Sequence, residues 1–136
     1  MRLVIPPGVF RPISDTWLLA AALEREPLGP GARVLDLCSG SGAVAVRAAL
    51  GGEPGRAAAP ARGATAARDG VAARQVTAVD ISRGAVAAIR LNAALNRARV
   101  RARRGDLFDA VAGERFDAIV SNPPYEIGRA SCRERV

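Results

Sequence analysis

The stretch best suited to chemistry is Ser-Asn-Pro-Pro-Tyr at residues 121–125, directly after an apolar run. The two prolines fix their own φ angles and keep the preceding residues extended, so the turn is stiff. The side-chain oxygen of Asn122 and the carbonyl of Pro123 can accept both hydrogens of an amide or exocyclic amine. Pro124 completes the turn, and Tyr125 offers an aromatic face. These residues predict a site for a planar nitrogen, although such turns also follow strands without any chemistry.

A second candidate site is the glycine-rich stretch Asp-Leu-Cys-Ser-Gly-Ser-Gly at residues 36–42, which follows a short apolar run. In a parallel sheet such a loop lies at the carboxyl edge, where ligands bind. Gly40 and Gly42 would let the backbone approach a ligand closely. The spacing Gly40-x-Gly42-x-x-Ala45 also fits the dinucleotide fingerprint, so the loop by itself leaves a nicotinamide-dependent oxidoreductase open.

Acidic residues at or just after the ends of three predicted strands narrow the choice of cofactor. Asp36 would repel a pyrophosphate but suits a ligand with an ammonium group and a sulfonium charge. Asp80 can accept hydrogen bonds from both ribose hydroxyls, and Asp106 from an adenine amino group, with Leu107 against the ring. Singly, each aspartate is also explained as a helix cap or turn residue. Their joint placement with Asn122 at four successive strand ends favours S-adenosylmethionine and methyl transfer to nitrogen.

Helical segments are expected at three places. One covers 16–25, with Ser14 or Asp15 as its cap; another covers 43–50, directly after the glycines; the third begins after Ser82.

Four short segments predict strands, at 33–37, 76–79, 100–104 and 116–120. Because strands alternate with helices, we expect an α/β fold with a mostly parallel sheet and right-handed crossovers. At 136 residues the length permits one domain.

The charge of the chain is strongly basic, with a net charge of +7 and an isoelectric point near 11.3. Such a balance would favour nucleic acid as a partner. However, all twenty basic residues are arginines, scattered among Ala, Gly and Pro without interleaved aromatic side chains. We interpret most of them as a solvated surface.

The two cysteines, Cys38 and Cys132, show no paired spacing, so no metal site is expected and an intracellular, cytoplasmic location is the simpler prediction. No stretch approaches the length of a membrane span. The apolar N-terminus is interrupted by Pro6, Pro7 and Gly8, and does not resemble a signal peptide.

Two segments depart from the alternating pattern. Residues 51–74, rich in Ala, Arg, Gly and Pro, are far longer than a usual helix-to-strand connection, and are interpreted as a low-complexity insertion or the product of a local reading-frame error. Residues 126–136 are similar to the translated read-through of a sequencing adapter, and are interpreted as non-native. On this interpretation residues 1–125 form a partial domain, truncated at its C-terminal end.

With these motifs in order, the chain resembles class I methyltransferases, specifically the short branch of the HemK-like protein glutamine N5-methyltransferases. The resemblance covers residues 8–125. It implies a Rossmann-like three-layer sandwich, of which this chain encodes only the N-terminal half. It also implies that Thr16 helps to hold the methionine part of the cofactor. The cofactor-binding residues that the resemblance implies are Thr16, Asp36, Cys38, Gly40, Gly42, Asp80, Asp106, Leu107 and Asn122. Catalysis would fall to Asn122, Pro123, Pro124 and Tyr125.

Two departures from the family pattern bear on the substrate. Cys38 stands where the family has glycine. The residues before Asp15 are too few for the N-terminal helical domain with which larger members recognise translation release factors. The resemblance implies a protein glutamine amide as the acceptor. The missing helical domain weakens a direct assignment to release factors, which stay one candidate partner. The alternatives are an amino group of adenine or guanine in a nucleic acid, flipped into the same turn, and an inactive fragment with an exposed strand edge.

Overall fold

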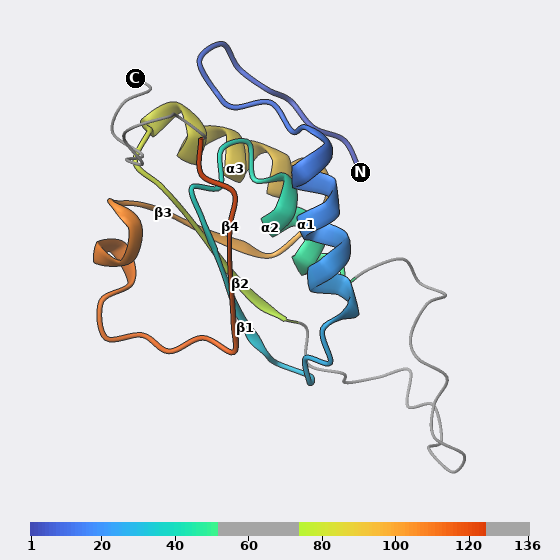
Figure 1. The fold of residues 1–136 in the computed structure, drawn as a ribbon. Helices are drawn as coiled ribbons and strands as arrows, with labels where there is room; N and C mark the ends of the chain where they lie inside the picture. The colour runs from blue at the N-terminus through green and yellow to red at the C-terminus, as the bar shows by residue number, and fades with distance from the viewer. Residues whose placement is uncertain (52–73, 125–136) are drawn as a thin grey trace.

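The computed structural model describes residues 1–51 and 74–124 (Figure 1). Within them, helices and strands alternate along the chain. The elements are α1 (Ser14–Arg25), β1 (Arg33–Leu37), α2 (Ala43–Ala49), β2 (Gln75–Asp80), α3 (Arg83–Leu95), β3 (Val100–Arg104), the 3-10 helix η1 (Leu107–Val111) and β4 (Ala118–Ser121).

The four strands form one parallel sheet in the order β3-β2-β1-β4. Leu37 at the end of β1 is in register with Val79 of β2 on one side and with Ser121 of β4 on the other. The loops that follow these strands therefore emerge together at the carboxyl edge. This confirms the predicted α/β class and parallel sheet.

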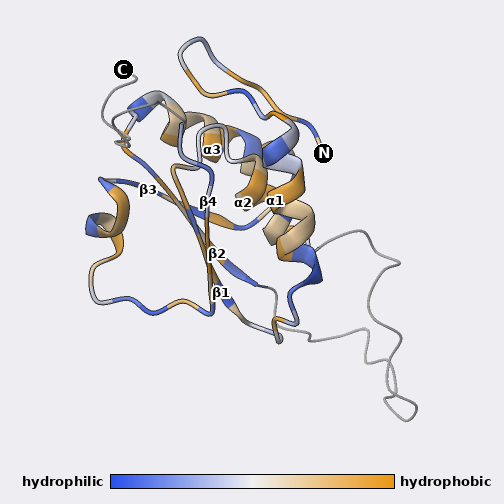
Figure 2. Cartoon of the chain, in the orientation of Figure 1, coloured by the Kyte–Doolittle hydropathy of each residue, from blue (hydrophilic) through white to orange (hydrophobic). Residues whose placement is uncertain are grey.

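The main core lies between the sheet and the helices. Alternate strand residues, such as Val34, Val76 and Ala78, face α1, α2 and α3 and are buried against side chains such as Leu23 and Ile89. Figure 2 shows the hydrophobic residues that run along α2 and α3. Burial of these apolar faces is the main force that holds the helices on the sheet.

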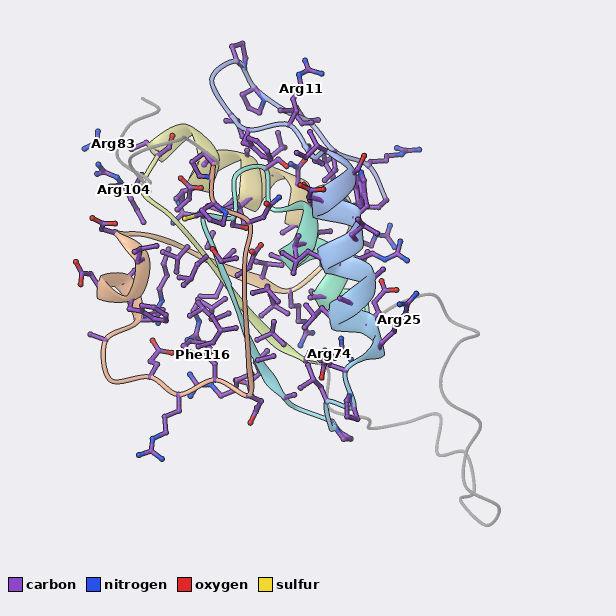
Figure 3. The ribbon with its side chains drawn as sticks, viewed as in Figure 1. Arg11, Arg25, Arg74, Arg83, Arg104 and Phe116 are labelled. Carbon is purple, nitrogen blue, oxygen red and sulfur yellow. The ribbon has the colours of Figure 1, made fainter. Side chains whose placement is uncertain are left out.

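The opposite face of the sheet carries a smaller cluster. Leu35, Leu37 and Val79 pack against Val111 of η1. Beside this cluster, Glu114 forms ion pairs with Arg33 and Arg103, at 2.7 and 2.5 Å. Phe116, labelled in Figure 3 on the η1 side of the strands, lies under the Arg33 guanidinium, 5.1 Å from ring centre to Cζ. Of the three layers expected, the described residues form the sheet and one helical layer.

The α2–β2 connection begins after α2, which runs away from the carboxyl edge, and rejoins the fold at the start of β2 (Figure 1). There the N–H of Gln75 donates to Ala32 O, just before β1. Residues 52–73 of the expected insertion lie outside the described residues.

The largest errors in the predicted boundaries concern α1 and β4. α1 begins at Ser14 with Ile13 as its cap, so Ser14 and Asp15 are inside the helix instead of capping it. The 3-10 helix η1, which begins at Leu107, was not predicted. β4 begins at Ala118, because the backbone N–H of Asp117 donates to Arg33 O and its carboxylate accepts from Arg33 N. Tyr125 and the adapter-like segment 126–136 lie outside the described residues.

Candidate functional site

A pocket opens at the carboxyl edge of the sheet, where the loops after β1, β2 and β4 meet the N-terminal segment. The residues that line it are Gly8, Val9, Phe10, Cys38, Gly40, Asp80, Ser82, Ala85, Asn122 and Pro124. The lining mixes backbone and carboxylate oxygens with apolar side chains, as in most sites for small organic ligands.

Asp80 joins two of the loops around this pocket. One carboxylate oxygen accepts the backbone N–H of Gly40 at 2.9 Å, and the other accepts the N–H of Ser82 at 2.9 Å. Each carboxylate oxygen has a further lone pair, so Asp80 can still accept hydrogen bonds from a ligand. Ser82 also caps α3 through its hydroxyl, which accepts the N–H of Ala85.

The glycine loop folds tightly between β1 and α2. Cys38, Gly40 and Gly42 all have positive φ angles, of 54°, 56° and 81°. The N–H of Gly42 donates to Ser39 O, and the N–H of Ser39 donates to Val79 O on the neighbouring strand. Cys38 adopts the left-handed conformation that glycine tolerates best, so a glycine at this position would relieve backbone strain.

Asp36 supports this loop from below. Its side chain is 2% exposed and shares the helix-facing side of β1 with Val34. The Ser39 hydroxyl donates to Asp36 Oδ2 at 2.6 Å. Desolvation by burial is the main cause that raises the Asp36 pKa to about 7, and the nearby Asp80 charge adds to it, while hydrogen bonds from Ser39 and the Ala45 backbone oppose the shift.

Asn122 follows β4 and is linked to α1. Its side-chain amide nitrogen donates to Thr16 Oγ1 at 3.2 Å. The same hydroxyl oxygen accepts the backbone N–H of Ile13 at 3.1 Å, which satisfies one of the open donors at the start of the helix. Within the described residues no side chain or backbone group donates to Asn122 Oδ1, so this oxygen can accept from a ligand.

The predicted site residues fall into two groups. Cys38, Gly40, Asp80, Asn122 and Pro124 line the pocket together. Thr16, Asp36 and Gly42 lie behind its walls, since Thr16 is buried beside Asn122, Asp36 lies under the loop, and Gly42 packs against Ile89.

The remaining predicted residues lie outside the set that lines the pocket. Pro123 is exposed. Asp106 and Leu107 follow β3 at the same edge, where the N–H of the preceding Gly105 donates to Asp80 O at 3.1 Å.

Sequence reasoning did not single out Val9, Phe10, Ser82 and Ala85 as pocket residues. Val9 and Phe10 belong to an irregular segment, and no periodic pattern indicates where such a segment will lie. Ser82 and Ala85 form the start of α3, so the predicted cap at Ser82 was the signal that could have placed them beside Asp80.

Neither a group of metal ligands nor a membrane-spanning helix is found in the described ranges, 1–51 and 74–124. No group of three or more His, Cys, Asp or Glu side chains there is placed to hold a metal ion. No helix in this part of the chain is long and apolar enough to cross a bilayer.

Comparison with known proteins shows the family to which the chain belongs. Residues 62–135, over half of the chain, match the family model described as "Methyltransferase small domain". A release factor glutamine methyltransferase of Bordetella pertussis is 40% identical over 123 residues, covering 89% of this chain. A ribosomal protein uL3 glutamine methyltransferase of Francisella tularensis is 37% identical over 94 residues, covering 68% of this chain. The chain spans 38% and 24% of the lengths of these two relatives.

Solved structures agree on the fold. A Thermus thermophilus 16S rRNA N2 G1207 methyltransferase, in complex with AdoMet and guanosine, superposes with a TM-score of 0.66 at 30% identity, covering 90% of this chain and 29% of its own. A ribosomal protein L11 methylase of Lactobacillus delbrueckii superposes with a TM-score of 0.60 at 28% identity, covering 86% of this chain and 50% of its own. The chain therefore belongs to the methyltransferase small domain family, among the class I S-adenosylmethionine-dependent methyltransferases.

Proposed function

We propose that this chain carries the cofactor site and the acceptor-binding turn of a methyltransferase that acts on a planar nitrogen, with the side-chain amide of a protein glutamine as the acceptor. The observation that carries the proposal is the position of Asn122. Its amide nitrogen is held by Thr16, and it lines the same pocket as Asp80 and Gly40.

The pocket residues fit S-adenosylmethionine. Asp80 offers two carboxylate oxygens with lone pairs to spare, as a ribose diol requires. Cys38 and Gly40 line the pocket with positive φ angles, and at Gly40 no side chain stands between the main chain and a ligand. Asp106 and Leu107, next to Gly105, would serve the adenine. When bound, the cofactor supplies an electrophilic methyl group on a sulfonium.

The acceptor side of the proposal rests on the electronics of the nitrogen. An amide lone pair is delocalised, so the nitrogen is a weak nucleophile until it is oriented. Asn122 Oδ1 and the Pro123 carbonyl would accept its two N–H bonds and turn the lone pair toward the pocket. Since Thr16 holds the other end of the Asn122 amide, this orientation is set before the substrate arrives. Catalysis would come from orientation and electrostatic matching, without a dedicated base.

The test is an Asn122→Ala variant assayed with cofactor that carries a labelled methyl group. We expect turnover to fall about a hundredfold or more, while cofactor affinity, measured by calorimetry, changes severalfold at most. Ser121→Ala is the matched control, because the Ser121 hydroxyl donates to Leu37 O and does not line the pocket. Turnover that is equal in Asn122→Ala and wild type would exclude the proposed role.

A second candidate is methylation of an amino group on a nucleic acid base. It is favoured by the likeness to an rRNA methyltransferase whose structure holds guanosine, and by the net charge of +7. Label transferred to ribosomal RNA instead of glutamine-containing protein would support this alternative.

Release factors and ribosomal protein uL3, which the named relatives methylate, are the first protein acceptors to try. Absence of both cofactor binding and cooperative unfolding would identify an inactive fragment.

A further inference from the structure

The N-terminal segment 2–10 forms a strap that lies along α3 and ends at the pocket (Figure 1). We propose that Asn92, a buried residue of α3, is a positioning residue that holds this strap over the cofactor site. The inference rests on the proposed cofactor function of the pocket.

Asn92 is fully buried, at 0% exposure, and uses every polar atom of its side chain. Its Oδ1 accepts the N–H of Val4 at 2.7 Å. Its Nδ2 donates to Val4 O at 2.9 Å and to Ser41 O at 2.8 Å. The Asn92 side chain thus joins the strap to the glycine loop. It pairs with both the N–H and the carbonyl of Val4, as the backbone of a neighbouring strand would.

Asn96 repeats this arrangement one helical turn later. Its Oδ1 accepts the N–H of Arg2 at 2.8 Å and its Nδ2 donates to Arg2 O at 2.6 Å. Residues four apart lie on the same face of a helix. The two asparagines therefore form a ladder that pairs with alternate residues of the strap.

The strap reaches the pocket a few residues after Val4. The N–H of Val9 donates to Pro6 O in a turn, and Val9 is buried at 9% exposure. Gly8, Val9 and Phe10 then line the pocket. Phe10 lies so close to the glycine loop that a Cβ placed on Gly40 would be 3.2 Å from Phe10 Cβ.

A buried polar side chain costs free energy unless it is fully hydrogen-bonded. An apolar residue at position 92 could be buried without that requirement, but it would provide no hydrogen-bond partner for Val4. The asparagine therefore specifies where the strap lies. Because three pocket residues follow on the same segment, loss of this attachment would remove one wall of the cofactor site.

The experiment compares the wild type with three variants. Asn92→Ala removes the side chain that holds the strap, and Val4→Pro removes the Val4 N–H donor while the Asn92 side chain stays in place. Arg90→Ala, at an exposed position of α3, is the control. Hydrogen exchange of the peptide covering residues 3–10 reports the attachment of the strap. Calorimetry with S-adenosylhomocysteine reports the site. We expect faster exchange and about tenfold weaker binding in the first two variants, and neither change in Arg90→Ala.

Unchanged exchange in Val4→Pro and in a folded Asn92→Ala would overturn the proposal, as would faster exchange with unchanged affinity. Circular dichroism identifies a variant that fails to fold, in which case Val4→Pro decides. A wild-type chain that does not bind S-adenosylhomocysteine would refute the proposed cofactor function. The exchange comparison would then support or overturn the attachment of the strap by Asn92.

Discussion

Asn122, after the last described strand, donates its side-chain amide to the hydroxyl of Thr16, in the first turn of α1, at 3.2 Å. The two residues are 106 positions apart in the chain. An amide that is held at its nitrogen presents its oxygen in one direction, so this contact fixes where Asn122 Oδ1 points. Thr16 is buried beside Asn122 and is not among the residues that line the pocket, and its expected contact with the cofactor stays a prediction.

Thr16→Val should lower turnover about tenfold to a hundredfold through loss of the Asn122 orientation, since small displacements of reacting groups are costly. Cofactor affinity should change much less. Thr16→Ser keeps Oγ1 and should retain most activity. Steady-state kinetics measure the turnover of each variant. Circular dichroism shows whether α1 still forms without the hydrogen bond from Ile13. Equal losses in both variants would contradict the role of the hydroxyl oxygen.

The stability of the chain should depend on pH through Asp36. Its pKa is about 7 in the folded chain, against 3.8 for the unperturbed group. Between these values the folded state binds more protons than the unfolded state, so the free energy of unfolding falls as pH rises from about 4 to about 7 and is level above. Asp36→Asn should flatten this slope and raise the melting temperature at pH 8. Asp109→Asn, on an exposed carboxyl, is the control; a wild-type slope in Asp36→Asn would contradict the assignment.

Alanine substitutions at Gly42 and Gly113 distinguish the cost of a strained backbone from the cost of a steric clash. Gly42 and Gly113 have nearly equal φ angles, of 81° and 78°. A Cβ on Gly42 would lie 3.1 Å from Ile89 Cα, whereas a Cβ on Gly113 would meet nothing within 4 Å. We expect Gly113→Ala to lower the free energy of unfolding by about 1 kcal/mol and Gly42→Ala by more than about 2 kcal/mol. Urea denaturation measures both, and equal losses would show that α3 adjusts freely.

Asp80 and Asp106 allow the two proposed contacts to the nucleoside to be compared. Asp80→Ala removes the carboxylate that holds Gly40 and Ser82, so S-adenosylhomocysteine should bind at least about a hundredfold more weakly. Asp106→Ala, at a residue that follows β3 outside the pocket lining, should weaken binding about tenfold. Calorimetry on both variants gives the comparison. A larger loss for Asp106 would mean that the adenine end dominates the affinity.

Much of the fold could be predicted because local and tertiary preferences agree. β1 and β3 have the expected bounds, and α2 ends one residue before the expected point. The prediction failed where a distant partner decides. α1 starts early because Thr16 bonds Ile13, and β4 starts late because Asp117 pairs with Arg33. Neither contact is visible in a local window of sequence.

The candidate site was predictable at the strand ends and less so elsewhere. The loops after β1, β2 and β4 bring Gly40, Asp80 and Asn122 together at one edge of the sheet, as expected. The position of Asp36 could have been inferred, since strand alternation puts it on the same side as Val34, under the helices. Asn92 was missed, although an asparagine in an apolar helix with another four residues later is unusual enough to indicate a specific partner.

The connection between α2 and β2 joins the described part of the fold at Gly51, after α2, and at Arg74, before β2. Among the described residues, those that line the pocket belong to the N-terminal segment, to the loops after β1, β2 and β4 and to the start of α3. Codons gained or lost between Gly51 and Arg74 would leave the lengths of these pocket segments unchanged. For protein engineering, this makes the connection the natural place to insert an epitope or a fluorescent reporter that must not perturb cofactor binding.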